Sequence, residues 1–334
     1  MSKKNNKDLA LNYNHDLASK FEKASKKKVE ISDFLTDFIN QFISPQTQKA
    51  YIGDLKNFFD FLKTGNVYIS HPSQIEGHHF QFYRDELIQQ KLSSATINRK
   101  LVAIRSFIKW AMACKLIDYN PLDIVKLPKV QTESPTLAFD DVEVVEMINK
   151  PDLSTKKGQM NRIVMMLLFS LGLRRSELTN IKCEDFYQER HHNVLKIRGK
   201  GGKDRHLPVA PYLAEAVRDY IEALKNFGIE LSAEDYLIQS AKKGKNEKAM
   251  DGSTVYRIIE KYAKECGITK KVSPHSCRAT AISHLLDTQK TPIRDVAIFA
   301  GHSKITTTER YDKRRESLDN SAAYNIDYGK KKAN

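Results

Sequence analysis

The chain has 334 residues, with 55 Lys and Arg against 41 Asp and Glu, for a net charge of +14. At roughly 100–200 residues per domain, this length predicts two domains. No apolar run approaches the roughly 18–20 residues that span a bilayer, and the N-terminus lacks the apolar stretch of a secretory signal. We therefore expect a soluble cytoplasmic protein that does not associate with a membrane.

The positive charge is spread along the chain, with +6 in residues 1–134 and +8 in the remainder. A basic excess of this size favours a polyanionic partner, most commonly nucleic acid, although a generally basic protein is the alternative. The four cysteines form no C-x-x-C pair and have no histidine pair at zinc-finger spacing. We therefore expect all four to be reduced and to have a structural role, and we expect no metal and no cofactor. The four cysteines are Cys114, Cys183, Cys266 and Cys277.

Residues 1–29 are polar and rich in lysine, which predicts a basic flexible arm. From Ile31 onward, apolar residues recur at helical spacing in four successive segments up to about Ile108. We predict a compact helical DNA-binding module over residues 30–127. The candidate DNA contacts outside its core are Lys49, Arg99, Lys100 and Arg105. Solvation of a charged surface is the alternative explanation for these four cations.

Prolines punctuate the next stretch and predict a linker at 128–137. A second domain over 138–317 opens with Asp140 and Glu143, which are spaced as a capping box. A strongly apolar helix follows at 161–171. The period then changes over 193–209, where alternating residues flank a glycine-rich turn and predict a β-hairpin.

Helical patterns resume at 211–226 and 253–266. Ser273-Pro274 predicts a helix start with a serine cap, and the helix should run to about Leu286. Thr291-Pro292 repeats this pattern, and Gly301 should end the helix that follows. The fold class predicted is therefore mainly α, with a helical domain followed by a mixed, mostly helical domain that holds a small antiparallel sheet.

Four segments of the second domain hold unusual polar residues in a fixed order. They are residues 171–178 (Leu-Gly-Leu-Arg-Arg-Ser-Glu-Leu), the turn with Lys200, residues 275–278 (His-Ser-Cys-Arg), and Gly301-His302 followed by Tyr311. Each motif alone is weak. Together and in this order, behind a basic helical module, they resemble the active site of the tyrosine recombinase family, which includes phage integrases and Xer-type resolvases. The resemblance covers all but the tails, and the module at 30–127 resembles that family's SAM-like core-binding domain.

The resemblance implies a catalytic set of six residues, which in chain order are Arg174, Lys200, His275, Arg278, His302 and Tyr311. Two arginines suit the growing negative charge of a phosphodiester transition state, since a guanidinium grips two oxygens and stays protonated. Lys200 would protonate the leaving 5′ oxygen. His275 would serve as general acid or base, and His302 would donate to a nonbridging oxygen.

Tyr311 would be the nucleophile, and because a free phenol has a pKa of about 10, nearby cations must stabilise its phenolate.

Neighbouring residues compete for two of the catalytic roles. Arg175 adjoins Arg174, and Lys203, also a candidate DNA contact, lies three residues beyond Lys200. The family pattern selects Arg174 and Lys200. Glu177 lies one helical turn beyond Arg174 and would brace it.

The function implied is site-specific recombination of double-stranded DNA without metal or ATP, through a 3′-phosphotyrosyl link and a Holliday junction. We expect a tetramer on DNA, with residues 318–334 exchanged between subunits or packed in cis, and accessory bending or directionality proteins are compatible with this role. A nicking-rejoining topoisomerase and a non-enzymatic DNA-binding regulator are the alternatives. Recognition of a target sequence would depend on how the domains dock on DNA, and phage integration, transposition and chromosome-dimer resolution are all compatible with these residues.

Overall fold

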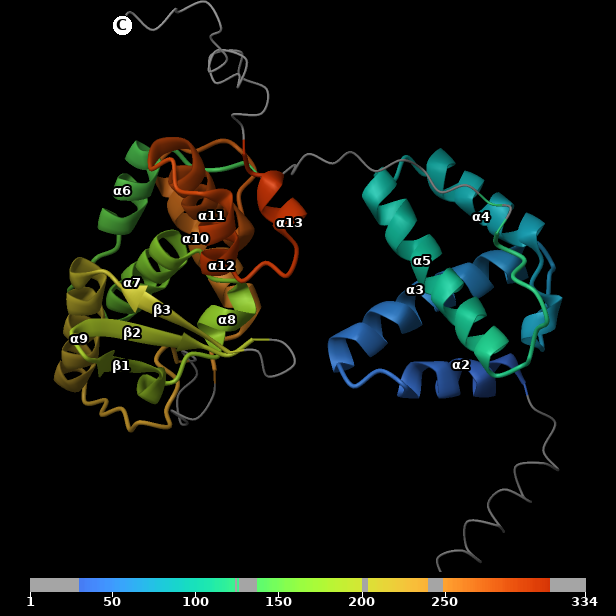
Figure 1. Cartoon of the computed structure of the whole chain (residues 1–334), viewed down its shortest axis with the longest axis horizontal. Coiled ribbons are helices and arrows are strands. Elements are labelled where there is room, and N and C mark those ends of the chain that lie inside the picture. The colour runs from blue at the N-terminus through green and yellow to red at the C-terminus, as the bar shows by residue number, and fades with distance from the viewer. Residues whose placement is uncertain (1–29, 124, 126–136, 200–203, 240–248, 313–334) are drawn as a thin grey trace, which may run out of the picture. The chain divides into compact units, whose positions relative to one another are not determined.

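A computed structural model describes residues 30–123, 125, 137–199, 204–239 and 249–312, and the chain divides into two compact units between Gln131 and Thr132. Figure 1 shows the first unit as helices alone and the second as helices with a small sheet. This is the mainly helical fold with a small antiparallel sheet that the periodicity predicted. The predicted arm at 1–29 and the segment 318–334 lie outside the described residues, as does most of the predicted linker.

The first unit is built from amphipathic helices whose starts are set by side-chain caps. The α-helices described between residues 30 and 125 are α2 (Ile31–Asn40), α3 (Pro45–Thr64), α4 (Gly77–Gln89) and α5 (Ser94–Ala113). Ser44 and Ser93 accept hydrogen bonds from the backbone N–H of the third residue of α3 and of α5. Such a cap satisfies a donor that the helix itself leaves unpaired.

Aromatic rings fill the core of this unit. Phe38 of α2 lies edge-on to Phe107 of α5, with ring centroids 5.5 Å apart. Phe58 of α3 meets Tyr83 of α4 at 5.3 Å in the same edge-to-face manner. The first pair joins α2 to α5 and the second joins α3 to α4, in the geometry that aromatic quadrupoles prefer.

The second unit consists of helices packed around one apolar helix. Its α-helices are α6 (Asp141–Asn149), α7 (Lys156–Leu171), α8 (Arg175–Thr179), α9 (Pro211–Asn226), α10 (Gly252–Glu265), α11 (Pro274–Ser283), α12 (Ile293–Ala300) and α13 (Ile305–Glu309). Helix α7 is buried on most of its surface and contacts α9 and α11. A helix that is apolar on every side must lie inside the unit.

The capping box predicted for α6 is present. Glu143 N–H donates to Asp140 at 2.8 Å, and Asp140 N–H donates to the Glu143 carboxylate at 2.8 Å. The structure starts α7 five residues earlier than the apolar pattern predicted, because Thr155 caps it by accepting a hydrogen bond from Gly158 N–H.

The sheet has three antiparallel strands in the order β1-β2-β3. They are β1 (Phe186–Glu189), β2 (His192–Ile197) and β3 (Arg205–Val209). The predicted hairpin supplies β2 and β3, with Ile197 opposite Arg205 in register. Strand β1 was missed, because its four residues are half-buried or exposed and show no alternation of burial.

The C-terminal helices differ from the prediction in detail. Helix α11 ends at Ser283, and a π-helical segment, His284–Thr288, continues it. Pro292 is the cap of α12 rather than its first residue. Tyr311 lies two residues beyond the end of α13. The short α13 therefore presents Tyr311 from a turn. Within the described residues, no helix is both long enough and apolar enough to cross a membrane.

Candidate active site

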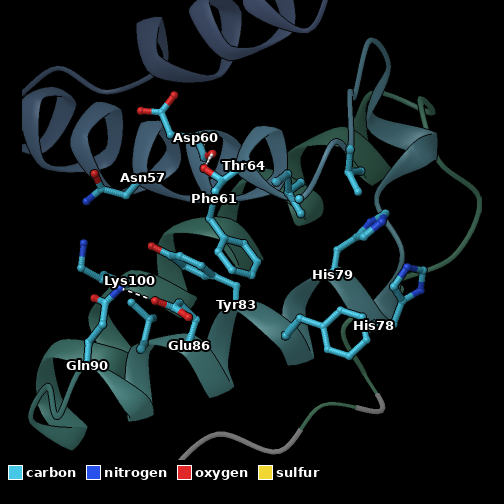
Figure 2. A pocket seen from close by; sticks show the side chains of 15 residues that line it. Asn57, Asp60, Phe61, Thr64, His78, His79, Tyr83, Glu86, Gln90 and Lys100 are labelled. Atoms are coloured by element: carbon cyan, nitrogen blue, oxygen red, sulfur yellow. Dashed lines mark hydrogen bonds between the residues drawn. The ribbon is translucent and has the colours of Figure 1, made fainter.

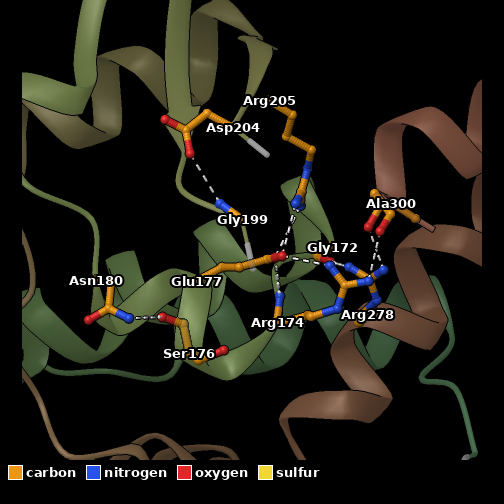
Figure 3. A network of polar contacts seen from close by, with 11 residues as sticks. Gly172, Arg174, Ser176, Glu177, Asn180, Gly199, Asp204, Arg205, Arg278 and Ala300 are labelled. Atoms are coloured by element: carbon orange, nitrogen blue, oxygen red, sulfur yellow. Dashed lines mark hydrogen bonds and ion pairs between the residues drawn. The ribbon is translucent and has the colours of Figure 1, made fainter. Parts of the chain in front are cut away.

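Arg278 is the buried centre of the site. It lies in the second turn of α11 and is 1% exposed. Its Nη1 donates to the Gly172 carbonyl at 2.6 Å, and its Nη2 donates to the Ala300 carbonyl at 2.5 Å (Figure 3). These carbonyls close the C-terminal ends of α7 and α12, where a cation is electrostatically favoured.

The glycines after α7 and α12 make this arrangement possible. Gly172 has φ +54° and Gly301 has φ +64°, a left-handed conformation that side chains with a Cβ rarely adopt. Each turn ends its helix sharply and leaves a carbonyl near Arg278. Because both partners are neutral carbonyls, they hold the guanidinium without cancelling its charge.

Arg174 caps the N-terminus of α8 and is half exposed at its side chain. Its backbone N–H and its Nη1 both donate to the Glu177 carboxylate, at 2.8 and 2.6 Å. Its Nη2 donates to the Gly301 carbonyl at 2.9 Å. Arg174 and Arg278 thus both donate to carbonyls at the end of α12, those of Gly301 and Ala300.

Glu177 is a buried carboxylate that joins two arginines. Its side chain also accepts hydrogen bonds from Arg205 of β3, at 2.8 and 3.0 Å. Burial on its own would raise the pKa of Glu177, but the hydrogen bonds from Arg205 and Arg174 outweigh it and hold the pKa at about 2. A carboxylate bonded by two guanidinium groups stays ionised at neutral pH.

Tyr311 and His275 form the second half of the site. The Tyr311 Oη lies 3.0 Å from the His275 Nε2, and Tyr311 is 8% exposed. His275 occupies the first turn of α11, one turn before Arg278. The helix phase therefore brings the imidazole and the guanidinium to the same face.

His302 follows the left-handed turn of Gly301 and lies on the other side of Tyr311. The two rings are nearly parallel, with centroids 6.2 Å apart. The His302 Nδ1 is 2.8 Å from the hydroxyl of Thr308, which is fully buried. One ring nitrogen is thus fixed by a side chain of α13, and the other is left for a ligand.

Burial and positive charge together set the titration of these groups. Burial, then Arg278 and Arg174, lower the pKa of His275 below its usual 6.5 and that of His302 to about 4. Burial raises the pKa of Tyr311, and the same two arginines oppose the rise. Arg278 keeps a pKa of about 10 after burial and Arg174 have lowered it. At neutral pH the site therefore holds cationic arginines, neutral histidines and a neutral phenol.

Five of the six predicted catalytic residues are brought together in this way. Lys200 and its rival Lys203 lie outside the described residues. Arg175 does not share the pocket of Arg174: its guanidinium lies against Gly252 at the start of α10, where an added Cβ would be 2.8 Å from Nε. No group of three His, Cys, Asp or Glu side chains able to hold a metal ion occurs in the described parts of the chain.

The predicted DNA contacts of the helical unit differ in their surroundings. Lys49 is exposed on α3. Arg99 and Lys100 both form ion pairs with the buried Asp54. Lys100 also lines a hollow of about 780 Å³ between α3 and α4 (Figure 2).

Arg105 differs from the other three cations. Its Nη2 donates to the carbonyls of Val125 and Leu122, at 2.6 and 3.4 Å, and its guanidinium lies 5.7 Å from the centre of the Phe80 ring. Arg105 thus joins α5 to the segment at Leu122 and Val125. Its place on the polar face of a helix did not indicate this structural role.

Sequence reasoning missed Arg205 and Thr308. Arg205 is the first residue of β3, and the only signal was an arginine close after the glycine-rich turn. Thr308 is one of three consecutive threonines, and nothing in that run marks it. Arg205 bonds Glu177, 28 positions away, which local patterns do not reveal, and Thr308 bonds His302, six positions away.

Known proteins show the same two-part organisation. Residues 138–317 match the model of the phage integrase family, and residues 31–115 match the phage integrase N-terminal SAM-like domain. The chain is 34% identical over 271 residues to a tyrosine recombinase of Pseudothermotoga lettingae, covering 80% of this chain and 87% of the relative. It is 30% identical over 286 residues to the tyrosine recombinase XerC of Thermodesulfovibrio yellowstonii, covering 83% and 90%.

Solved structures share the fold. A lambda integrase dimer bound to a COC′ core site superposes with a TM-score of 0.64 at 16% identity, covering 86% of this chain and 95% of that chain. The XerH site-specific recombinase in a post-cleavage complex with difH gives 0.63 at 18%, covering 81% and 78%. The chain belongs to the phage integrase family of tyrosine recombinases. It is therefore an enzyme of the tyrosine recombinase class.

Proposed function

We propose that the chain recombines double-stranded DNA at specific sites through a covalent link to Tyr311. The lambda integrase and XerH structures that share its fold are complexes with DNA sites. The net charge of +14 suits the same ligand. The observation that carries the proposal is the 3.0 Å contact between Tyr311 Oη and His275 Nε2 beside two buried or half-buried arginines.

The first step is a transesterification. The Tyr311 Oη attacks the scissile phosphorus, and its proton passes to the His275 Nε2, which the lowered pKa keeps unprotonated at neutral pH. The bond from phosphorus to the 5′ oxygen breaks, and Lys200 protonates that oxygen. The products are a 3′-phosphotyrosyl ester and a free 5′ hydroxyl.

Arg174 and Arg278 stabilise the charge that accumulates on the nonbridging oxygens. Their positions are fixed before DNA binds, by Glu177 and by helix-end carbonyls, so little reorganisation accompanies the reaction. His302 donates from Nε2 to a nonbridging oxygen. In the tautomer that this role requires, the Thr308 hydroxyl donates to the His302 Nδ1.

A 5′ hydroxyl of the second DNA then attacks the phosphotyrosyl ester and releases Tyr311. Because one phosphodiester replaces another of similar energy, rejoining requires no ATP. Two such rounds pass through a Holliday junction and need four active sites. We propose a tetramer on DNA in the cytoplasm, with residues 318–334 exchanged between subunits or packed in cis; the lambda integrase tetramer bound to a Holliday junction shares the fold. Residues 30–127 and 138–317, joined by a linker at 128–137, would act as the DNA-binding and catalytic domains.

Covalent trapping tests the proposal. Protein is mixed with nicked DNA from the ends of its own genetic element, and wild type and Tyr311→Phe are compared on a denaturing gel. We expect an adduct with wild type alone. An adduct with Tyr311→Phe would move the nucleophile elsewhere, and tight binding without any adduct would favour a DNA-binding regulator. Relaxation of supercoiled DNA without strand exchange would favour a topoisomerase.

A further inference from the structure

Arg205 is an arginine of the site that takes no direct part in the steps of strand cleavage. It begins β3, and its side chain is 17% exposed. Its Nη1 and Nη2 each donate to one oxygen of Glu177, at 2.8 and 3.0 Å (Figure 3). This two-pronged geometry fixes both the place and the plane of the carboxylate.

Arg205 also contacts the turn after α12. A Cβ added to Gly301 would lie 2.8 Å from its Nη1 and 3.1 Å from its Cζ, so the guanidinium lies directly over that glycine. The same glycine carries the carbonyl bonded to Arg174 and precedes His302. One side chain of the sheet thus touches both groups that orient Arg174.

We propose that Arg205 is a positioning residue for strand cleavage: it holds Glu177 and the Gly301 turn so that Arg174 and His302 meet the scissile phosphate in one fixed geometry. It acts through these neighbours and does not itself contact the phosphate. The proposal rests on the proposed function of the site.

The charges around Glu177 explain why one arginine is not enough. The cations facing this carboxylate are Arg174, Arg205 and the more distant Arg278. Without Arg205, each carboxylate oxygen loses one of its two donors and keeps only the one from Arg174, so the pKa of Glu177 rises and its carboxylate is held from one side only. A Glu177 carboxylate that rotates holds Arg174 less firmly, and a shift of about 1 Å in a positioning group can cost about 10²-fold in rate.

The test compares Arg205→Met, Arg205→Lys, Glu177→Gln and the double variant Arg205→Met with Glu177→Gln. Arg218→Met is the matched control, because Arg218 also links the sheet to a helix, through Asn193, but lies outside the site. The rate of adduct formation is measured at saturating nicked DNA, together with DNA affinity and thermal unfolding. A second readout is the titration of the Glu177 carboxyl by carbon-13 NMR, with its signal identified by its absence in Glu177→Gln.

We expect Arg205→Met to slow adduct formation by about 10²-fold at unchanged DNA affinity, Arg205→Lys to slow it less, and Arg218→Met to match wild type. The double variant should be no slower than the slower single variant, since the two residues act as one unit, and added guanidinium ion should partly restore Arg205→Met. The carboxyl of Glu177 should titrate at higher pH in Arg205→Met.

Wild-type cleavage by folded, DNA-bound Arg205→Met would overturn the proposal, as would losses that simply add in the double variant or follow the unfolded fraction. If wild type itself forms no adduct, the proposed function fails. The NMR titration then still decides whether Arg205 holds Glu177, and an unchanged titration in Arg205→Met would overturn that link as well.

Discussion

Tyr311 and His275 face each other across 3.0 Å, although 36 residues separate them in the chain. Their pKa values move in opposite directions from their usual ones. Burial raises the pKa of the phenol, while burial and two arginines lower that of the imidazole. The free site therefore holds a proton on the phenol oxygen and an unprotonated acceptor beside it. Under the proposed function, the Tyr311 Oη loses this proton as it attacks the phosphorus.

His275 should set the acid limb of the cleavage rate. Because the reaction needs the unprotonated imidazole, the rate should fall as pH drops through the pKa of His275, which lies below 6.5. His275→Gln should remove this limb and lower the rate by about 10²–10⁴-fold. His284→Gln, a change on the π-helical segment, is the control. Single-turnover adduct formation across pH measures both, and an unchanged acid limb in His275→Gln would assign it to another group.

Glu177 should make the catalytic unit less stable in acid. Its pKa is about 2 in the folded protein against the ordinary 4.5. A depressed pKa stabilises the fold fully above the ordinary value and progressively less as pH falls from there toward 2. The contribution is roughly 3 kcal/mol. Urea unfolding of wild type and Glu177→Gln should therefore show a gap near neutral pH that narrows at about pH 3, whereas the gap for the exposed Glu184→Gln should stay small.

Gly301→Ala should lower cleavage activity more than an alanine placed at another left-handed glycine. The left-handed backbone costs alanine about 1–2 kcal/mol, and the new Cβ would also displace the Arg205 guanidinium. Gly228 is the matched control, since it has φ +73° with no atom within 4 Å of an added Cβ. Both variants should lose similar stability from strain, but only Gly301→Ala should also lose cleavage activity in the fraction that remains folded. Equal activity per folded molecule would show that the Arg205 contact does not matter.

Substitutions at Lys49 and Arg105 should have different effects, the first on DNA binding and the second on the stability of the fold. Lys49→Ala should weaken binding to all DNA sequences alike and reduce the slope of log affinity against log salt by about one. Arg105→Ala should instead lower the free energy of unfolding, because two carbonyls lose a charged donor. Salt titration of DNA binding and urea unfolding, run on both variants, measure the difference. If Arg105→Ala folds stably but shows a smaller slope of log affinity against log salt, Arg105 contacts DNA after all.

Much of the fold could be predicted because it follows local rules. The apolar period of α3 and α5, the capping box of α6 and the left-handed glycine after α12 each depend on residues a few positions apart. The order of the arginine, histidine and tyrosine motifs likewise pointed to the family. Arg205 could not be predicted, because its partners, Glu177 and Gly301, are 28 and 96 positions away and only the packing of β3 against α8 and α12 brings them together.

Because Arg278 is held by the ends of two helices, the same docking step that completes the fold also places this side chain in the site. Its partners are main-chain carbonyls at the ends of α7 and α12, so the guanidinium is in place only while both helices are docked. A molecule in which α12 has come away also loses the turn that places His302 and holds Arg174. Under the proposed function, a copy in which α12 is undocked lacks the placed Arg278, Arg174 and His302 together, so local unfolding of this helix should abolish cleavage and not leave a partial activity.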